Sequence, residues 1–218
     1  MKRIFLAMLV MLCCFSMGGC SPVERVASIE NDDQIIMTVY AYDGQGESRF
    51  GLLNLGHSFL SIENKSDQSI IIGNYELPKD DIVTLSTWCV SEHFGIWYNM
   101  ESNYIKYHDK YNGRYSVSIG LELDKLEAIN NYIKNNDTWV PTKNCTNFSV
   151  GLWNSVCDEK EKLSTPLIYT PKKLTEDIKS FNVYEYNKDI PVSDRLGYFD
   201  SSNNFVTFAF EKALEGGI

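Results

Sequence analysis

"GHSFLSIENKSDQSIIIGNYEL", residues 56–77, is the stretch that decides the fold, because it predicts a β-hairpin with a histidine at its start. In the first strand the side chains alternate, so that His57, Phe59 and Ser61 share one face. "NKSDQS" has the composition of a turn, and "IIIGNYEL" is the predicted return strand, which Pro78 ends. The strand therefore gives the histidine a fixed direction.

Strands precede and follow a group of helices along the rest of the chain. Residues 84–111 are rich in aromatic side chains without a clear period, which predicts a long loop packed on the domain. The other elements are predicted as strands over residues 34–43 and 113–123, helices over residues 124–136, from residue 145 onward and over residues 170–181, and strand-like pieces over residues 182–187 and 203–210. This order predicts an α+β protein with an antiparallel sheet, in a single domain spanning residues 34–218.

Capping residues mark the predicted helix starts. Asp124 opens the first helix, and Glu127 three residues later predicts a capping pair. Asn144 is a predicted N-cap for the second helix. Thr170 is the predicted cap of the third helix, with Pro171 in its first turn.

The N-terminus has the layout of a secretory signal, with a basic start, an apolar run and a small-residue end. The ending "MGGC" resembles a bacterial lipobox, although Met17 replaces the more usual leucine. The resemblance implies that residues 1–19 are removed and that Cys20 carries a diacylglycerol. Residues 20–33 are then predicted to be a tether. We therefore expect an exported protein, anchored by lipid in the cell envelope of a bacterium.

The charge of the chain argues against nucleic acid as a partner. Removal of the two cations of the signal would change the formal net charge from −9 to −11. So acidic a domain binds phosphate backbones poorly and is repelled by anionic lipid headgroups. A lipid, and not charge, would hold it at a membrane.

Three of the six cysteines remain once the signal is removed and Cys20 is acylated. An odd number in an exported protein leaves at least one thiol unpaired. Cys89 and Cys157 are candidates for a disulfide, and the sequence leaves this pairing open. If that bond forms, Cys145 is the free thiol.

Cys145 and His57 together suggest an acyl-transfer site. Cys145 lies in the first turn of its predicted helix, where the helix dipole favours a thiolate. The N–H groups of that turn lack helical partners and are available to an oxyanion. The chain has three histidines, and His57 is the one at the start of a strand. Taken alone, each residue is better explained by a structural role, as a buried thiol or a half-buried strand histidine. Their joint pattern favours a nucleophile and its base.

"GHSFLSI" followed by "NCTNF" resembles the circularly permuted branch of the papain-like, NlpC/P60-type superfamily. In that branch the histidine strand precedes the nucleophile helix. Gly56-His57 matches the start of the strand, and Asn144-Cys145 with Phe148 matches the start of the helix. The resemblance implies a papain-like α+β core and attack of a thiol on an amide, ester or thioester. It also makes peptidoglycan peptides a candidate substrate.

The resemblance further implies that the strand after the histidine strand supplies a residue that orients the imidazole. A turn centred early in "NKSDQS" pairs His57 with Asn74, which is the preferred candidate. Sliding the register pairs His57 with Glu76 instead, and an intermediate register places Tyr75 there.

Two other interpretations compete with the enzyme. The aromatic stretch could form a groove that binds glycan or peptide without catalysis, in which case Trp88 and Trp97 should be exposed together. The second interpretation is a lipoprotein that keeps the fold as a scaffold and has no catalytic activity. No Cys-x-x-Cys or His-x-x-x-His pattern is present, so the sequence predicts no metal site and no cofactor.

Overall fold

The computed structural model describes residues 25–44, 56–166 and 168–209. The predicted signal and the acylation of Cys20 lie outside the described residues. Within them, a large antiparallel sheet and four α-helices confirm the predicted α+β class.

The centre of the sheet is an antiparallel pair, β1 (Ile35–Tyr42) and β2 (His57–Asn64), in which Tyr42 lies opposite His57. Nearly every side chain of both strands is buried, because elements cover both faces of the sheet. The eight strands are ordered β10-β9-β6-β5-β2-β1-β7-β8. The outer strands are β5 (Ile82–Val90), β6 (His93–Tyr98), β7 (Tyr115–Leu121), β8 (Glu185–Tyr186), β9 (Gly197–Phe199) and β10 (Phe205–Thr207).

The predicted pairing of residues 57–64 with residues 70–77 is wrong. Strand β2 pairs with β1 and β5, while β3 (Ile70–Ile72) and β4 (Tyr75–Leu77) form a separate two-stranded sheet. The reason is a tight turn at Gly73, whose φ of 64° lies in the left-handed region that such turns require. The turn folds "IIIGNYEL" onto itself, so that Asn74 lies at its tip and not opposite His57.

The aromatic stretch is not a loop. It forms β5, β6 and the helix α2 (Met100–His108). Strand β5 is buried on both faces and therefore lacks the alternation that reveals a half-exposed strand. The step from β6 to α2 occurs at Asn99, which adopts a φ of 63°.

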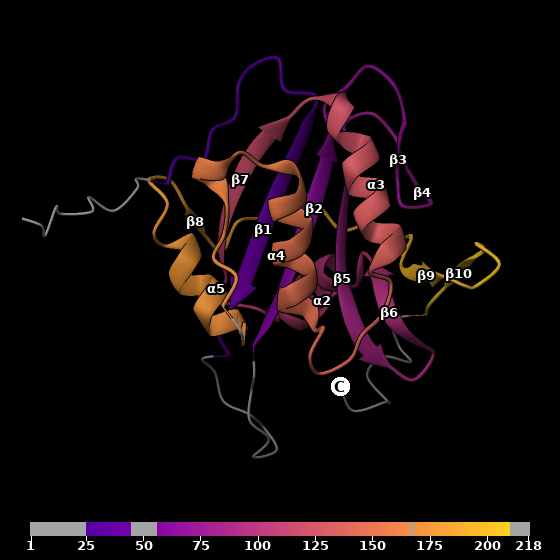
Figure 1. Ribbon diagram of the computed structural model, residues 1–218. Helices are drawn as coiled ribbons and strands as arrows, with labels where there is room; N and C mark the ends of the chain where they lie inside the picture. The colour runs from indigo at the N-terminus through magenta and orange to yellow at the C-terminus, as the bar shows by residue number, and fades with distance from the viewer. Residues whose placement is uncertain (1–24, 45–55, 167, 210–218) are drawn as a thin grey trace, which may run out of the picture.

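Three helices cover one face of the sheet: α3 (Leu126–Asn135), α4 (Cys145–Val156) and α5 (Pro171–Ile178), while α2 lies behind it (Figure 1). The predicted caps of α4 and α5 are confirmed, since Asn144 and Thr170 both accept backbone hydrogen bonds. The predicted capping pair at Asp124 is wrong, because Asp124 lies within a short 3₁₀ turn, Leu123–Lys125, that precedes α3.

The main hydrophobic core lies between the sheet and the three covering helices. Its largest fully buried side chain is Trp153 of α4, whose indole N–H donates to the carbonyl of Glu161 at 2.8 Å. Smaller clusters on the side of α2 surround Trp97 and Phe59. Burial on this scale on both faces fixes the strand order and, with it, the position of His57.

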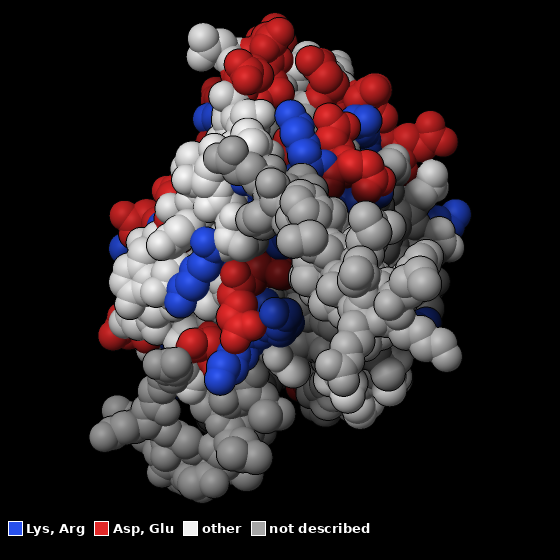
Figure 2. All heavy atoms as spheres, turned by 60° about the vertical axis from the view of Figure 1, so that its left-hand side comes forward, with Lys and Arg blue, Asp and Glu red and all other residues white. Residues whose placement is uncertain are grey.

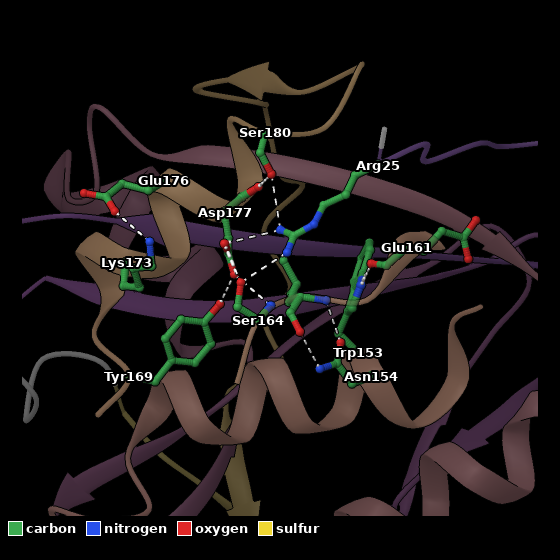
Figure 3. Close-up of polar contacts among 11 residues, drawn as sticks. Arg25, Trp153, Asn154, Glu161, Ser164, Tyr169, Lys173, Glu176, Asp177 and Ser180 are labelled. Atoms are coloured by element: carbon green, nitrogen blue, oxygen red, sulfur yellow. Dashed lines mark hydrogen bonds and ion pairs between the residues drawn. The ribbon is translucent and has the colours of Figure 1, made fainter. Parts of the chain in front are cut away.

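The N-terminal segment contacts the domain from Arg25 onward. The Arg25 guanidinium lies 3.3 Å from an Asp177 oxygen and donates to Ser164 at 3.1 Å (Figure 3). Asp177 also accepts hydrogen bonds from the Ser164 backbone N–H at 2.8 Å and from the Tyr169 hydroxyl at 2.6 Å. Burial alone would raise the pKa of Asp177, but these donors and Arg25 hold it below its usual value. With the hydrogen bonds of Ala27 to Asn182 and of Gly120 to Ser28, these contacts hold residues 25–28 of the predicted tether against the domain.

On the face drawn in Figure 2, acidic side chains gather at the upper end, and acidic and basic side chains lie close together lower down. None of the helices in the described ranges is long and apolar enough to span a bilayer.

Candidate active site

Cys145 is the first residue of α4, as predicted. The N-cap residue Asn144 binds some of the backbone N–H groups in the first turn of this helix. The Asn144 side chain accepts from the N–H groups of Thr146 at 2.9 Å and Asn147 at 3.2 Å. The Phe148 N–H donates to the Asn144 carbonyl. Among the described residues, the Cys145 N–H has no hydrogen-bond acceptor. It is therefore the one first-turn donor left for an oxyanion, where the sequence suggested several.

His57 is buried, with 8% of its surface exposed, at the first position of β2. The residue before it must be glycine, since Gly56 has a φ of 77° and an added Cβ would lie 2.2 Å from the Tyr42 carbonyl oxygen. This close approach of β1 and β2 sets the direction in which His57 leaves the strand.

The structure brings Cys145 and His57 together. The thiol and the imidazole share a hydrogen bond, and each changes the pKa of the other. Burial would raise the pKa of Cys145, but the charge of His57 and hydrogen bonds from His57 and Ser58 lower it to about 7. Burial would likewise lower the pKa of His57, but the Cys145 thiolate and Glu101 raise it to about 9. The stable form between these values is a thiolate beside an imidazolium.

A buried carboxylate completes the site. His57 Nε2 lies 3.0 Å from Glu101 Oε1, and the Trp88 indole N–H donates to the same oxygen at 2.7 Å. Glu101 is fully buried in the first turn of α2, where the helix dipole favours a negative charge. With Nε2 bound to Glu101, Nδ1 is the ring nitrogen left for the Cys145 thiol.

Asn99 fixes the start of α2 and thereby Glu101. Its side-chain oxygen accepts from the Thr84 N–H of β5 at 3.0 Å, and its amide donates to the Tyr75 hydroxyl and the Arg195 carbonyl, both at 3.0 Å. Its backbone N–H donates to the Thr84 carbonyl at 2.8 Å. The carboxylate is thus held by the sheet as well as by its own helix.

Aromatic rings enclose the imidazole of His57. The ring centroids of Trp88, Tyr111 and Phe59 lie 4.4, 5.3 and 6.1 Å from its own. They keep water from most of the histidine and strengthen its interactions with the two charged partners.

Asn74, the preferred orienting residue, does not contact His57. It is exposed and donates to Asn203 Oδ1 at 3.0 Å. Of the two alternatives, Glu76 is exposed opposite Ile71, and Tyr75 is buried and accepts from Asn99. The group that contacts the imidazole in their place is Glu101.

Sequence reasoning missed Glu101 because it lies in the stretch interpreted as a loop. One signal was present: Glu101 is the single acidic residue between Glu92 and Asp109, in the middle of the aromatic stretch. A lone carboxylate among aromatic residues that become buried needs partners, and here these are a histidine and an indole.

Cys89, Cys145 and Cys157 are all free thiols, so the candidate disulfide between Cys89 and Cys157 is absent. Cys157 caps the C-terminal end of α4, and burial followed by the charge of Glu161 raises its pKa to about 12. Cys89 is exposed on β5. The surroundings of Cys145 lower its pKa, whereas those of Cys157 raise it.

No group of three or more potential metal ligands occurs within the described ranges. The chain matches no protein-family model, no curated protein and no solved structure. The chemistry of the site must therefore be argued from its own geometry.

Proposed function

We propose that this protein is a thiol hydrolase or acyltransferase that acts on an amide or ester bond. The observation that carries the proposal is the contact chain from Cys145 through His57 to Glu101, in which a helix-start thiol, a strand histidine and a buried carboxylate come from three separate elements. Structural thiols and histidines rarely need such partners, whereas a nucleophile needs a base and the base needs an orienting group.

The reaction begins with the ion pair. The Cys145 thiolate attacks the carbonyl carbon, and the negative charge that develops on the carbonyl oxygen is received by the free Cys145 N–H. The carbon–nitrogen or carbon–oxygen bond then breaks, and the leaving amine or alcohol takes the proton of the His57 imidazolium. An acyl group is left on the sulfur as a thioester.

The second half of the reaction regenerates the Cys145 thiolate. Neutral His57 removes a proton from water, or from an acceptor alcohol or amine, and the resulting nucleophile attacks the thioester. The carbon–sulfur bond breaks, the acyl product leaves, and His57 is again an imidazolium beside the thiolate. Glu101 remains ionised throughout and holds the ring so that Nδ1 faces the sulfur.

The order of elements fits a permuted papain-like core, and we include this fold in the proposal. The histidine strand β2 precedes the cysteine helix α4, and α4 packs against β2 through the hydrogen bond from Ser58 to Thr146 at 3.1 Å. With the predicted signal and lipid at the N-terminus, peptides of the cell wall are the proposed substrate class. The predicted anchoring in the cell envelope, beside the cell wall, supports this choice.

The alternative, an aromatic groove without catalysis, lacks the feature that it requires. Trp88 and Trp97 are 8% and 0% exposed, so neither indole presents a surface to a ligand. Trp88 instead donates to Glu101 within the candidate site.

The test uses a generic activated ester, because the natural acyl group is not specified. The full-length chain is incubated with p-nitrophenyl acetate, and the acylated peptide is identified by mass spectrometry. We expect a burst of nitrophenol and an acetyl group on Cys145, both abolished in Cys145→Ser. Cys89→Ser, which removes an exposed thiol, is the matched control and should leave the burst intact. Acetylation of Cys89 or Cys157 at the rate of Cys145 would refute the assignment.

A further inference from the structure

A hollow lies on the side of α3 that faces the β3–β4 turn, and Cys145 does not line it. It has a volume of about 320 Å³ and is bounded by α3, that turn, β6 and the β9–β10 hairpin, which lie together at the right of Figure 1. Its lining residues are Gly73, Asn74, Ile96, Tyr98, Asn130, Asn131, Ile133, Lys134, Asp137, Phe199, Asp200 and Asn203. Neither Cys145 nor His57 belongs to it.

The hydroxyl of Tyr98 is the most informative group in this hollow. Tyr98 is 3% exposed and its hydroxyl makes no hydrogen bond among the described residues, but the oxygen itself keeps some exposure and is not among the fully buried polar atoms. The donor and the acceptor of this hydroxyl are therefore both unused at the wall of the hollow. Gly73 keeps the space beside the hydroxyl open, because an added Cβ would lie 2.4 Å from that oxygen. The hydroxyl can therefore donate to, and accept from, a molecule that enters the hollow.

The other polar groups of the hollow include both hydrogen-bond donors and acceptors. Asn74 donates to Asn203, which leaves one amide oxygen and one amide nitrogen of this pair without a partner in the described chain. Asp137 uses one oxygen to accept from the Ile96 N–H at 2.6 Å and to pair with His93 at 3.0 Å, and its second oxygen has no such partner. The lining of the hollow therefore offers both unused donors and unused acceptors.

The charges of the lining argue for a neutral ligand. Asp137 and Asp200 oppose an anion, while the ammonium of Lys134 opposes a cation. A hydroxyl group both donates and accepts, so several hydroxyls on one molecule match amides, a carboxylate and a phenol together. The ring of Phe199, which is partly exposed, provides an apolar surface for the C–H face of a sugar ring.

We propose that this hollow binds a short neutral saccharide through Tyr98, the Asn74–Asn203 pair and Asp137. The size fits one or two sugar rings, at the lower end of the range of small-molecule sites. The proposal goes beyond the thiol chemistry and does not depend on it, because neither Cys145 nor His57 lines the hollow.

The experiment measures backbone amide shifts by NMR and binding heat by calorimetry, with the full-length chain and millimolar chitobiose or maltose. We expect at least one of the sugars to move the amide signals of Gly73, Asn131 and Asn203. Tyr98→Phe should weaken binding about 2- to 12-fold, the worth of one hydrogen bond, without loss of fold. Tyr186→Phe, which removes an exposed hydroxyl on β8, is the matched control and should bind as the parent does.

A second pair of variants keeps the test independent of Tyr98. Asn131→Trp places a large side chain in the lining and should abolish binding, whereas Asn135→Trp, on the same helix but outside the lining, should not. The proposal is overturned if neither sugar moves these amides, or if both tryptophan variants bind alike. It is also overturned if the dipeptide alanyl-alanine moves them and the sugars do not. The alkylation rate of Cys145 should be the same in all variants, which separates this outcome from the fate of the proposed enzyme.

Discussion

The chemistry of the candidate site depends on a balance between burial and charge at single residues. Burial opposes the charged forms of both Cys145 and His57, and each group is charged because the other lies beside it. Removal of either partner therefore leaves a buried group that reverts to its neutral form.

The reactivity of Cys145 should follow the two pKa values. Its pKa is lowered to about 7 and that of His57 is raised to about 9, so the thiolate–imidazolium pair exists between these values. Acylation should rise as pH passes 7 and fall again as His57 loses its proton near 9.

In His57→Ala the imidazolium is gone, so the pKa of Cys145 should rise. Iodoacetamide should then label Cys145 more slowly at pH 7. An unchanged labelling profile in His57→Ala would contradict the pair.

Glu101→Gln tests the orienting carboxylate while keeping its volume. The glutamine still accepts from Trp88, but its charge no longer stabilises the imidazolium. We expect turnover of the activated ester to fall about 100-fold or more, and the alkaline limb of its pH profile to move to lower pH. Asn74→Ala is the control and should retain parental turnover, since Asn74 contacts Asn203 and not His57. Equal losses in both variants would argue that Glu101 has only a structural role.

Among the helices and strands, short sequence patterns were enough to predict the elements that carry Cys145 and His57. The position of Glu101 and the pairing partners of β2 depend on long-range packing. Asn144 marks the start of α4 within a few residues of sequence, and alternation marks β2. Glu101 reaches His57 only after β5, β6 and α2 have formed between them, 44 residues along the chain. The same stretch could form the short hairpin that turns at Gly73 or the longer predicted hairpin with residues 57–64. The short hairpin forms because β5, and not residues 70–77, pairs with β2. Neither contact can be read from a local pattern.

Asn99 is the residue on which the placement of α2 depends. Asn99→Ala removes the hydrogen bonds to Thr84, Tyr75 and Arg195 and places an alanine at a φ of 63°. We expect the free energy of unfolding to fall by about 2–4 kcal/mol in urea titrations. Asn99→Gly loses the same side chain but tolerates the backbone, so it should cost about 1 kcal/mol less. If the two variants are equally stable, the left-handed backbone contributes nothing to the loss.

For the whole molecule, the Arg25–Asp177 contact attaches the N-terminal segment to α5. The folded-state pKa of Asp177 is lowered, so the stability that it contributes is present above the usual carboxylate pKa and is lost as pH falls through the folded value. Arg25→Ala should therefore lower the free energy of unfolding by about 1–2 kcal/mol at pH 7, and by less once Asp177 is protonated. Lys173→Ala, which breaks the exposed pair with Glu176, is the control and should change stability by less than about 0.5 kcal/mol. A loss in Arg25→Ala that is the same at every pH would exclude an electrostatic origin.

The predicted lipid on Cys20 is tested in the cells that make the protein. The parent chain should fractionate with membranes and carry a lipid mass on its N-terminal peptide, whereas Cys20→Ala should be released or remain unprocessed. Cys89→Ser should fractionate as the parent does. Membrane fractionation that is unchanged in Cys20→Ala, with no lipid mass in the parent, would contradict the prediction.

The attachment of Arg25 has a consequence for where such an enzyme would act. Cys20 precedes Arg25 by five residues, and five extended residues span at most about 17 Å. A lipid on Cys20 would therefore confine the domain to a thin layer beside the bilayer, and its search for substrate would become two-dimensional. Its rate would then follow the number of substrate bonds per unit area of envelope, whereas dissolved substrates would reach the site equally well with or without the lipid.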